Sequence, residues 1–380
     1  MTYVFVFWLM TLRHYKSEPQ NVVVKKSIKD YLYIGYITGL CLCFAFCVSY
    51  QYPEMEYKAM KLKYESISFS EEVDDYRFYT AYPFQDNNIL ATLDEPSTLQ
   101  FDELETTPRL DGATAFYPIY SAFVQAAFTG FKEYAETSNG DYYLFEAAAN
   151  SFESNILSCT KTSAAYNRLV DKQVDMIFAF EPSESQIAAA EAKGEKFVLT
   201  PLGYDAFCFF VNTNNPVNTL TVEQVRNIYK GKIKNWKKVG GKNKRIMAFT
   251  RPANSGSQTI MENSVMQGEK INTRYQAFNV RTMGGMIRVI DSYLNTPAAI
   301  GYTFMYYSTA MVTSDKIKYI AINNVPPNSE TVRNRTYAFS ETFYAITLES
   351  NDDSNTAALL DWVTGPQGQE IVAKTGYLAV

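Results

Sequence analysis

The chain has 380 residues, 47% of them hydrophobic, so it is long enough to bury the cores of two or three domains. Its formal net charge of −5 argues against a nucleic-acid partner. The only histidine is His14, so the main body cannot hold a Ser–His–Asp system, a Cys–His nucleophile or a histidine-based zinc site. We therefore expect no catalysis, no metal and no cofactor.

The first predicted element is a membrane-spanning helix over residues 31–50. This stretch carries no charged side chain, and as a helix it would span about 30 Å, the thickness of a bilayer core. Lys25, Lys26 and Lys29 precede it, so the positive-inside rule places residues 1–30 in the cytoplasm and the remainder outside. A cleaved signal peptide would have a shorter apolar region and a small-residue cleavage site. We therefore expect an uncleaved, single-pass anchor in the cell membrane.

The next segment, residues 51–105, is acidic. Its charged residues include Glu71, Glu72, Asp74 and Asp75, with few basic residues to offset them. Such a composition disfavours a packed core. We expect a solvated extracytoplasmic linker without a functional site.

From Asp111 onward, short apolar runs alternate with helical patterns, which favours the α/β class. Thr221 and Gln224 have the spacing of a capping box. Cys208 lies in an apolar run, which favours a buried core thiol, and nothing supports a disulfide with Cys159. The expected strands are residues 174–180, 207–211, 246–250, 299–303 and 343–347, and the expected helices are 116–124, 164–170, 221–229, one starting at 255 and a final one running through 357–371.

Three hydroxyl-bearing helix starts are the main functional signal. Thr114, Thr162–Ser163 and Ser255–Ser257 each stand where backbone N–H groups and the helix dipole favour an anion. In an open α/β sheet such turns gather at the crevice beyond the strand ends. Together they predict a site for a small oxyanion.

Arg251 strengthens this prediction, because it precedes the third helix start and offers a planar fork to an oxyanion. Gly256 lets a ligand approach the backbone closely. Ser255 and Gln258 also have capping-box spacing, so the plainer alternative is a capped helix beside a surface arginine.

The order and spacing of several motifs resemble the substrate-binding proteins of ABC phosphate importers, which have a two-lobed periplasmic-binding-protein fold. The resemblance implies two α/β lobes that close over a ligand by hinge motion. The first lobe is expected to comprise residues 106–202 and 316–380, and the second residues 203–315. The resemblance covers residues 106–380 and rests on the motifs at 111–118, 220–236, 251–259, 299–302 and 362–368.

The resemblance also implies a set of phosphate-binding residues. Glu181 is the nearest match to a family carboxylate that accepts the proton of monohydrogen phosphate and would be left unpaired against sulfate. The alternative is that Glu181 is a solvated residue before Pro182. Ala253 stands where relatives often carry an acidic residue. The remaining residues are Thr114, the Ala115 backbone, Thr162 and Ser163 from the first lobe, and Arg251, Ser255, Gly256 and Ser257 from the second.

We therefore expect a membrane-anchored extracytoplasmic protein that captures inorganic phosphate and is recognised by the permease subunits of an ABC importer. Two alternatives keep a binding role: a tethered sensor or scaffold without an importer, and a binder of another oxyanion such as sulfate or molybdate. An enzyme acting on phosphate esters is disfavoured, because the chain has no P-loop GKS or GKT sequence and its main body lacks histidine.

Overall fold

The computed structural model describes residues 28–67, 83–84, 88–131, 156–272 and 278–380. It divides into two compact units, one that ends at Glu54 and one from Met55 to Val380. The apolar stretch 3–12, His14 and the acidic residues 71–75 lie outside the described residues.

Helix α2 (Ile28–Glu65) contains the predicted membrane span. Its most apolar 18-residue window has a mean hydropathy of 1.6 and is not buried, so by length and composition the helix meets the requirement for crossing a membrane. It is the one such helix among the described residues. The helix passes through Pro53 and continues to Glu65 instead of ending near Tyr50.

The predicted α/β class is confirmed by a mixed sheet with helices packed against it. Its strand order is β1-β2-β9-β3-β6-β5, with β10 and β7 also paired to β3, and β4 and β8 form a separate two-stranded sheet. The strands are β1 (Leu110–Gly112), β2 (Met176–Ala179), β3 (Phe197–Asn212), β4 (Thr219–Leu220), β5 (Met247–Ala248), β6 (Ala299–Phe304), β7 (Ile317–Tyr319), β8 (Ala321–Ile322), β9 (Ser340–Leu348) and β10 (Leu378–Ala379).

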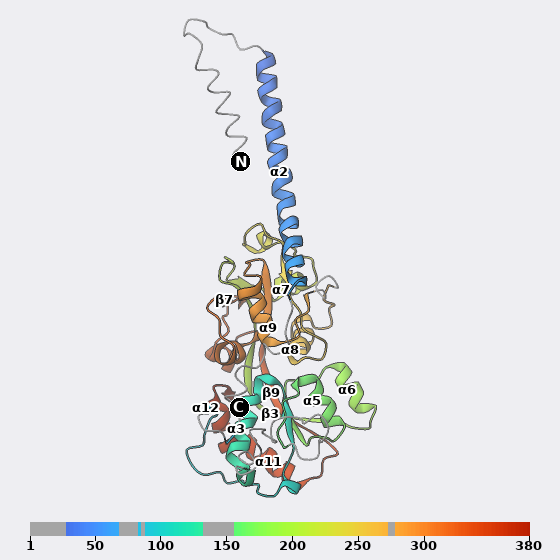
Figure 1. Cartoon of the computed structure of the whole chain (residues 1–380), viewed down its shortest axis with the longest axis vertical. Coiled ribbons are helices and arrows are strands. Elements are labelled where there is room, and N and C mark those ends of the chain that lie inside the picture. Colours follow the sequence, from blue (N-terminus) through green and yellow to red (C-terminus); the bar gives the residue numbers. More distant parts are fainter. Residues whose placement is uncertain (1–27, 68–82, 85–87, 132–155, 273–277) are drawn as a thin grey trace. The chain divides into compact units, whose positions relative to one another are not determined.

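The helices form two groups, which Figure 1 separates clearly. Helices α3, α5, α6, α11 and α12 accompany β1, β2 and β9, and we call this group the first lobe. Helices α7, α8 and α9 accompany β5, β6 and β7, the second lobe. The helices are α3 (Tyr117–Ala127), α5 (Lys161–Val170), α6 (Glu184–Glu191), α7 (Val222–Tyr229), α8 (Gly256–Ile260), α9 (Met283–Arg288), α10 (Ser329–Arg333), α11 (Ser354–Thr364) and α12 (Pro366–Thr375).

Short 3₁₀ and π-helical turns extend several of these elements. The 3₁₀ turns are η3 (Leu104–Thr106), η4 (Thr114–Phe116), η5 (Thr129–Phe131) and η7 (Trp236–Val239), and the π-helical turns are η8 (Met261–Met266), η10 (Val289–Tyr293) and η11 (Tyr307–Met311).

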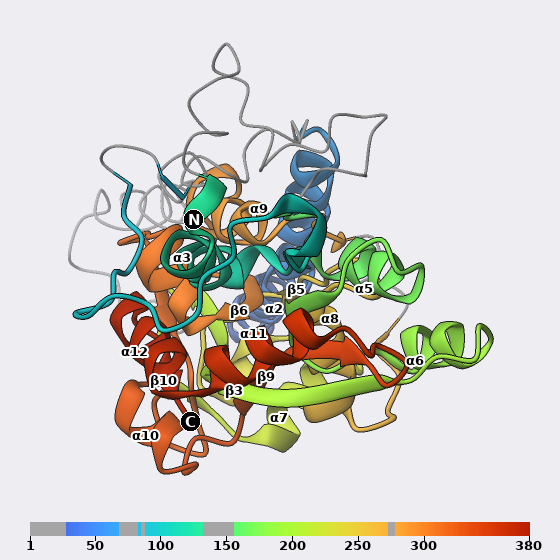
Figure 2. The same cartoon turned by 90° about the horizontal axis from the view of Figure 1, so that it is seen from below.

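Strand β3 belongs to both lobes. Residues 197–206 pair with β9 in the first lobe, and residues 207–211 pair with β6 in the second (Figure 2). The predicted crossing near residue 203 therefore falls inside this strand. The return crossing lies later than the predicted residue 316, because β7 pairs with the second-lobe half of β3 and β8 pairs with β4.

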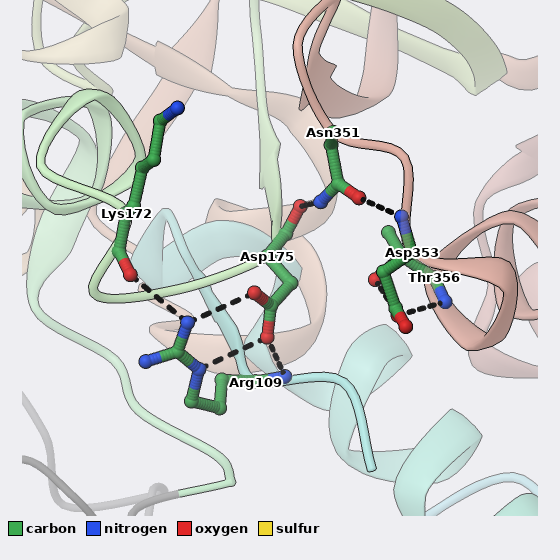
Figure 3. Close-up of polar contacts among 6 residues, drawn as sticks. All are labelled: Arg109, Lys172, Asp175, Asn351, Asp353 and Thr356. Atoms are coloured by element: carbon green, nitrogen blue, oxygen red, sulfur yellow. Dashed lines mark hydrogen bonds and ion pairs between the residues drawn. The ribbon is translucent and has the colours of Figure 1, made fainter. Parts of the chain in front are cut away.

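The starts of β1 and β2 are tied together by an ion pair. Arg109 donates from Nε to Asp175 Oδ2 at 3.0 Å and from Nη2 to Asp175 Oδ1 at 2.9 Å (Figure 3). Asn351 Nδ2 reaches the Asp175 carbonyl at 3.5 Å, and Asn351 Oδ1 accepts from the Asp353 amide before α11. Because β1 and β2 are parallel, their carboxyl ends emerge together at the opposite edge.

From Met55 onward, the described parts of the expected linker belong to the second unit and contribute buried side chains to it, which differs from the predicted solvated spacer. At the end of α2, Tyr64 is only 6% exposed, lies edge-on to Phe249 and Phe278, and donates to the Asn279 carbonyl at 2.9 Å. Further along, Leu90 and Phe101 are buried. Aromatic side chains spaced along one face of the helix favour its burial, and this effect is stronger here than the tendency of the acidic composition to keep the segment in solvent.

The C-terminal helix prediction was wrong in one respect. Helix α11 ends at Thr364 and α12 begins at Pro366, because proline lacks an amide hydrogen and Gly365 is extended. The predicted capping box at Thr221 and Gln224 is confirmed, and Cys208 is buried in β3. Cys159 and Cys208 are both free thiols.

Asp205 is a buried carboxylate at the point where β3 passes from one lobe to the other. It is 2% exposed, and its Oδ1 accepts from the amides of Ala206 at 2.7 Å and Tyr306 at 3.3 Å. Its Oδ2 is buried without a hydrogen-bond partner among the described residues. Burial raises the pKa of Asp205 to about 7.

We predict that Asp205→Asn stabilises the protein more at pH 8 than at pH 4. An unfolded aspartate ionises near pH 3.9, while folded Asp205 keeps its proton up to about pH 7, so the wild-type protein loses stability as pH rises between these values. Asparagine removes this loss, which is on the order of 4 kcal/mol at most. Urea denaturation across pH measures the difference. Exposed Asp352→Asn is the control, and a pH-independent difference for Asp205→Asn would contradict the prediction.

Candidate functional site

A small cavity lies where the carboxyl ends of four strands meet. Its volume is 180 Å³, and its walls come from the turns at 113–115, 161–163, 251–257 and 281–283, with Phe180, Phe304 and Tyr307. The turns at 113–115 and 251–257 follow β1 and β5, and Phe180 and Phe304 stand at the ends of β2 and β6. The turns at 161–163 and 281–283 follow isolated parallel bridges at Leu157 and Asn279. The two parallel pairs, β1 with β2 and β5 with β6, explain this convergence, because parallel strands end at the same edge.

The structure brings most of the predicted site residues to this cavity. The eight that line it are Thr114, Ala115, Thr162, Ser163, Arg251, Ser255, Gly256 and Ser257. They come from both lobes. A Cβ atom built on Gly256 would lie 3.2 Å from Thr162 Oγ1, so the absence of a side chain at Gly256 allows the lobes to meet.

Glu181 does not join them, which corrects the sequence prediction. It lines a separate cavity of 420 Å³ together with Pro182 and Phe197, and its Oε1 accepts from Tyr344 Oη at 3.1 Å. Phe180 occupies the wall of the smaller cavity instead and stacks on Phe304 with ring centroids 4.0 Å apart. Phe180 and Glu181 are thus neighbours in the chain, just after β2, but line different cavities.

Three of the helix starts at the cavity lack side-chain caps, whereas at the start of α9 the Thr282 side chain accepts from the Gly285 amide at 3.1 Å. Ala113, Thr160 and Ser255 precede η4, α5 and α8, and none accepts a capping hydrogen bond through its side chain. By contrast, Ser183 and Asp353 cap α6 and α11 away from the cavity. The backbone amides at the cavity are therefore oriented as donors for an anion.

Ser255 and Gln258 do not form the predicted capping box. Ser255 Oγ donates to the Pro252 carbonyl at 2.8 Å, and Gln258 Oε1 accepts from the Arg251 amide at 3.0 Å. Tyr302 Oη also donates to Gln258 Oε1, and burial raises the pKa of Tyr302 so that it keeps its proton. Gln258 thus fixes the backbone of the arginine and does not cap the helix.

Arg251 is the buried cation of the cavity wall. It is 8% exposed, and two neutral oxygens orient its side chain: Ser257 Oγ lies 3.3 Å from Nε, and the Val280 carbonyl lies 3.1 Å from Nη1. These two contacts orient the guanidinium. A buried positive charge of this kind favours a bound anion.

A buried ion pair shapes the turn before α5. Asp111 is fully buried and accepts from Arg168 Nη1 at 2.6 Å, from the Thr160 amide at 2.8 Å and from Thr160 Oγ1 at 2.6 Å. Lys161, next in the chain, has φ of 72°, a left-handed conformation that non-glycine residues rarely adopt. These contacts hold the turn that presents Thr162 and Ser163.

Several residues that line the cavity were not predicted from the sequence. Phe180 and Phe304 end strands, so the strand-end rule could have identified them. Arg281, Met283 and Tyr307 also line the cavity but belong to no motif used above. Exposed Arg281 and exposed Lys161 add two further cations to the wall.

The chemistry of the wall suits a small oxyanion. It offers guanidinium groups, hydroxyls and backbone amides, all of which donate hydrogen bonds to oxygen. Within the described ranges, no cluster of three or more Cys, His, Asp or Glu side chains is placed to hold a metal ion.

The chain is similar to proteins of a known family. The family model for a PBP superfamily domain matches residues 109–367. A phosphate-binding protein PstS of Borreliella burgdorferi is 26% identical over 185 residues, which cover 48% of this chain and 65% of the relative. A phosphate-binding protein PstS of Bacillus subtilis is 29% identical over 127 residues, covering 33% and 39%. The alignments thus span less than two thirds of either relative.

Two solved structures share the fold. A putative phosphate ABC transporter substrate-binding protein with bound phosphate from Clostridium perfringens is 24% identical with a TM-score of 0.54, over 72% of this chain and 99% of that chain. An ABC-type phosphate transport receptor from Vibrio cholerae is 21% identical with a TM-score of 0.52, over 72% and 100%. At these identities the structures confirm the α/β binding-protein fold.

We predict that Arg168→Met lowers the free energy of unfolding by about 3–5 kcal/mol, because it leaves the Asp111 carboxylate buried without its cation. Lys196→Met is the matched control, because its pair with Glu349 is exposed and contributes less than about 1 kcal/mol. Urea denaturation measures both. Equal losses in the two variants would contradict a structural role for the buried pair.

Proposed function

The chain belongs to the PBP superfamily, and on that premise we propose that it captures inorganic phosphate between its two lobes. We further propose that α2 anchors it in the cell membrane with the lobes outside, and that the permease subunits of an ABC importer recognise it. No catalytic step is part of this proposal. The observation that carries it is the buried guanidinium of Arg251, which shares one small cavity with uncapped helix starts from both lobes.

The cavity volume supports an ion of this size. A volume of 180 Å³ corresponds to about six water molecules at about 30 Å³ each, so the cavity has room for the five non-hydrogen atoms of phosphate. The relatives named phosphate-binding proteins support the same ligand. A tetrahedral oxyanion would receive donors from several directions, as the turns from both lobes provide.

Arg251→Met is expected to weaken phosphate binding at least about thirtyfold, because truncating one partner of a buried, charged hydrogen bond costs about 2 kcal/mol or more. Calorimetry on the full chain in detergent measures this. Residues 55–65 must be kept, because removing Tyr64 would uncover Phe249 and Phe278. Arg333→Met, which removes an exposed arginine of α10, is the control. Unchanged affinity in Arg251→Met would exclude this arginine from the site.

Glu181→Gln is expected to leave both phosphate affinity and the preference for phosphate over sulfate unchanged. Glu181 lines a different cavity and contacts Tyr344, so it does not face the proposed ligand. Parallel titrations with phosphate and sulfate measure both quantities. A loss of selectivity in this variant would restore the proton-acceptor role that the sequence resemblance implied.

A further inference from the structure

The second lobe carries a concentrated run of positive charge that the chain's net charge conceals. Residues 230–245 contain seven lysines and one arginine among sixteen residues and no acidic residue. The chain as a whole has more acidic than basic residues. The run is therefore a local positive surface on an acidic protein.

Five of these lysines are exposed, and we call them together the lysine patch: Lys232, Lys234, Lys237, Lys238 and Lys242. The backbone brings the two ends of the run together, since the amide of Trp236 donates to the Lys244 carbonyl and that of Ile246 donates to the Lys234 carbonyl. Between them, Lys237 and Lys238 lie on the 3₁₀ turn η7, which ends at left-handed Gly240.

The base of this loop is fixed. Trp236 is 1% exposed and donates from Nε1 to the Ala298 carbonyl at 2.9 Å, so it anchors η7 in the core. The charged side chains are therefore held on a rigid support and do not sit on a loose loop. The pKa of neighbouring Lys230 is lowered, first by burial and then by Lys232 and Arg226, which is consistent with crowded positive charge.

The same loop contacts the end of α2. Lys244 pairs with Glu56, and the guanidinium carbon of Arg245 lies 4.2 Å above the ring of Tyr57. Glu56 is only six positions after Tyr50, the end of the predicted membrane span. Even a fully extended chain of that length reaches only about 20 Å, and a helix reaches about 9 Å. Covalent connection alone thus keeps the lysine patch near any membrane that holds α2.

From this connection we propose that the lysine patch binds anionic lipid headgroups of the membrane that holds α2. The inference rests on the proposed membrane anchor. Lysines near a negatively charged leaflet are attracted within about one Debye length, roughly 10 Å. Nucleic acid is a poorer match, because the aromatic residue within the patch, Trp236, is buried and offers no stacking surface.

Amine labelling of the full chain in lipid nanodiscs tests the proposal. Labelling is read lysine by lysine by mass spectrometry, in discs of phosphatidylcholine alone and in discs that also contain phosphatidylglycerol. We expect Lys237, Lys238 and Lys242 to label at least about twofold more slowly with phosphatidylglycerol, and this protection to disappear at high salt. Lys193 and Lys196 of the first lobe, both exposed, should label equally in the two lipids.

Equal labelling of the patch in the two lipids, or protection that salt does not reduce, would overturn anionic lipid as the partner. A Lys237→Gln/Lys238→Gln double variant should also reduce the protection of Lys232 and Lys234. Co-elution of the chain with the discs tests the anchor, and phosphate titration in the same discs tests ligand capture. The double variant should bind phosphate normally, because neither lysine lines the cavity. These measurements thus distinguish a lysine patch that does not bind lipid from a chain that does not bind phosphate or is not anchored.

Discussion

The structure of the site depends on burying one guanidinium. Arg251 is buried in the second lobe, where Ser257 and the Val280 carbonyl set the direction of its guanidinium. Burying a cation is costly, and the anion in the proposed function would offset part of that cost. The helix starts of the first lobe line the same cavity. In the proposed function, ligand binding and contact between the lobes would therefore be coupled electrostatically.

In each lobe, buried hydrogen bonds fix the segments that line the cavity. In the first lobe, Asp111 joins Arg168 to the turn before Thr162. In the second, Tyr64 donates to the Asn279 carbonyl, and the adjoining Val280 donates its amide hydrogen to the Thr250 carbonyl and accepts from Arg251. The last turn of α2 is thus two hydrogen bonds away from the guanidinium. A segment first interpreted as a linker is part of the architecture of the site.

Local patterns in the sequence predicted most of the site, because helix starts have short-range signatures. Thr114, Thr162 and Gly256 were identified in this way and line one cavity. The predictions that were wrong concern side chains whose partners lie far away in the sequence. Gln258 has capping-box spacing like Gln224, but the Arg251 amide and Tyr302 take its side chain. The direction of Glu181 depends on where the strand ends, which its sequence neighbours do not specify. The lysine run was overlooked because net charge averages over the whole chain.

Strand β3 sets the mechanics of any lobe movement. It keeps ladder hydrogen bonds to β9 along one half and to β6 along the other, with no intervening loop. Buried Asp205 sits at the changeover between these partners. Any change in the angle between the lobes would therefore have to change the twist of this continuous strand, near its irregularity between Pro201 and Gly203.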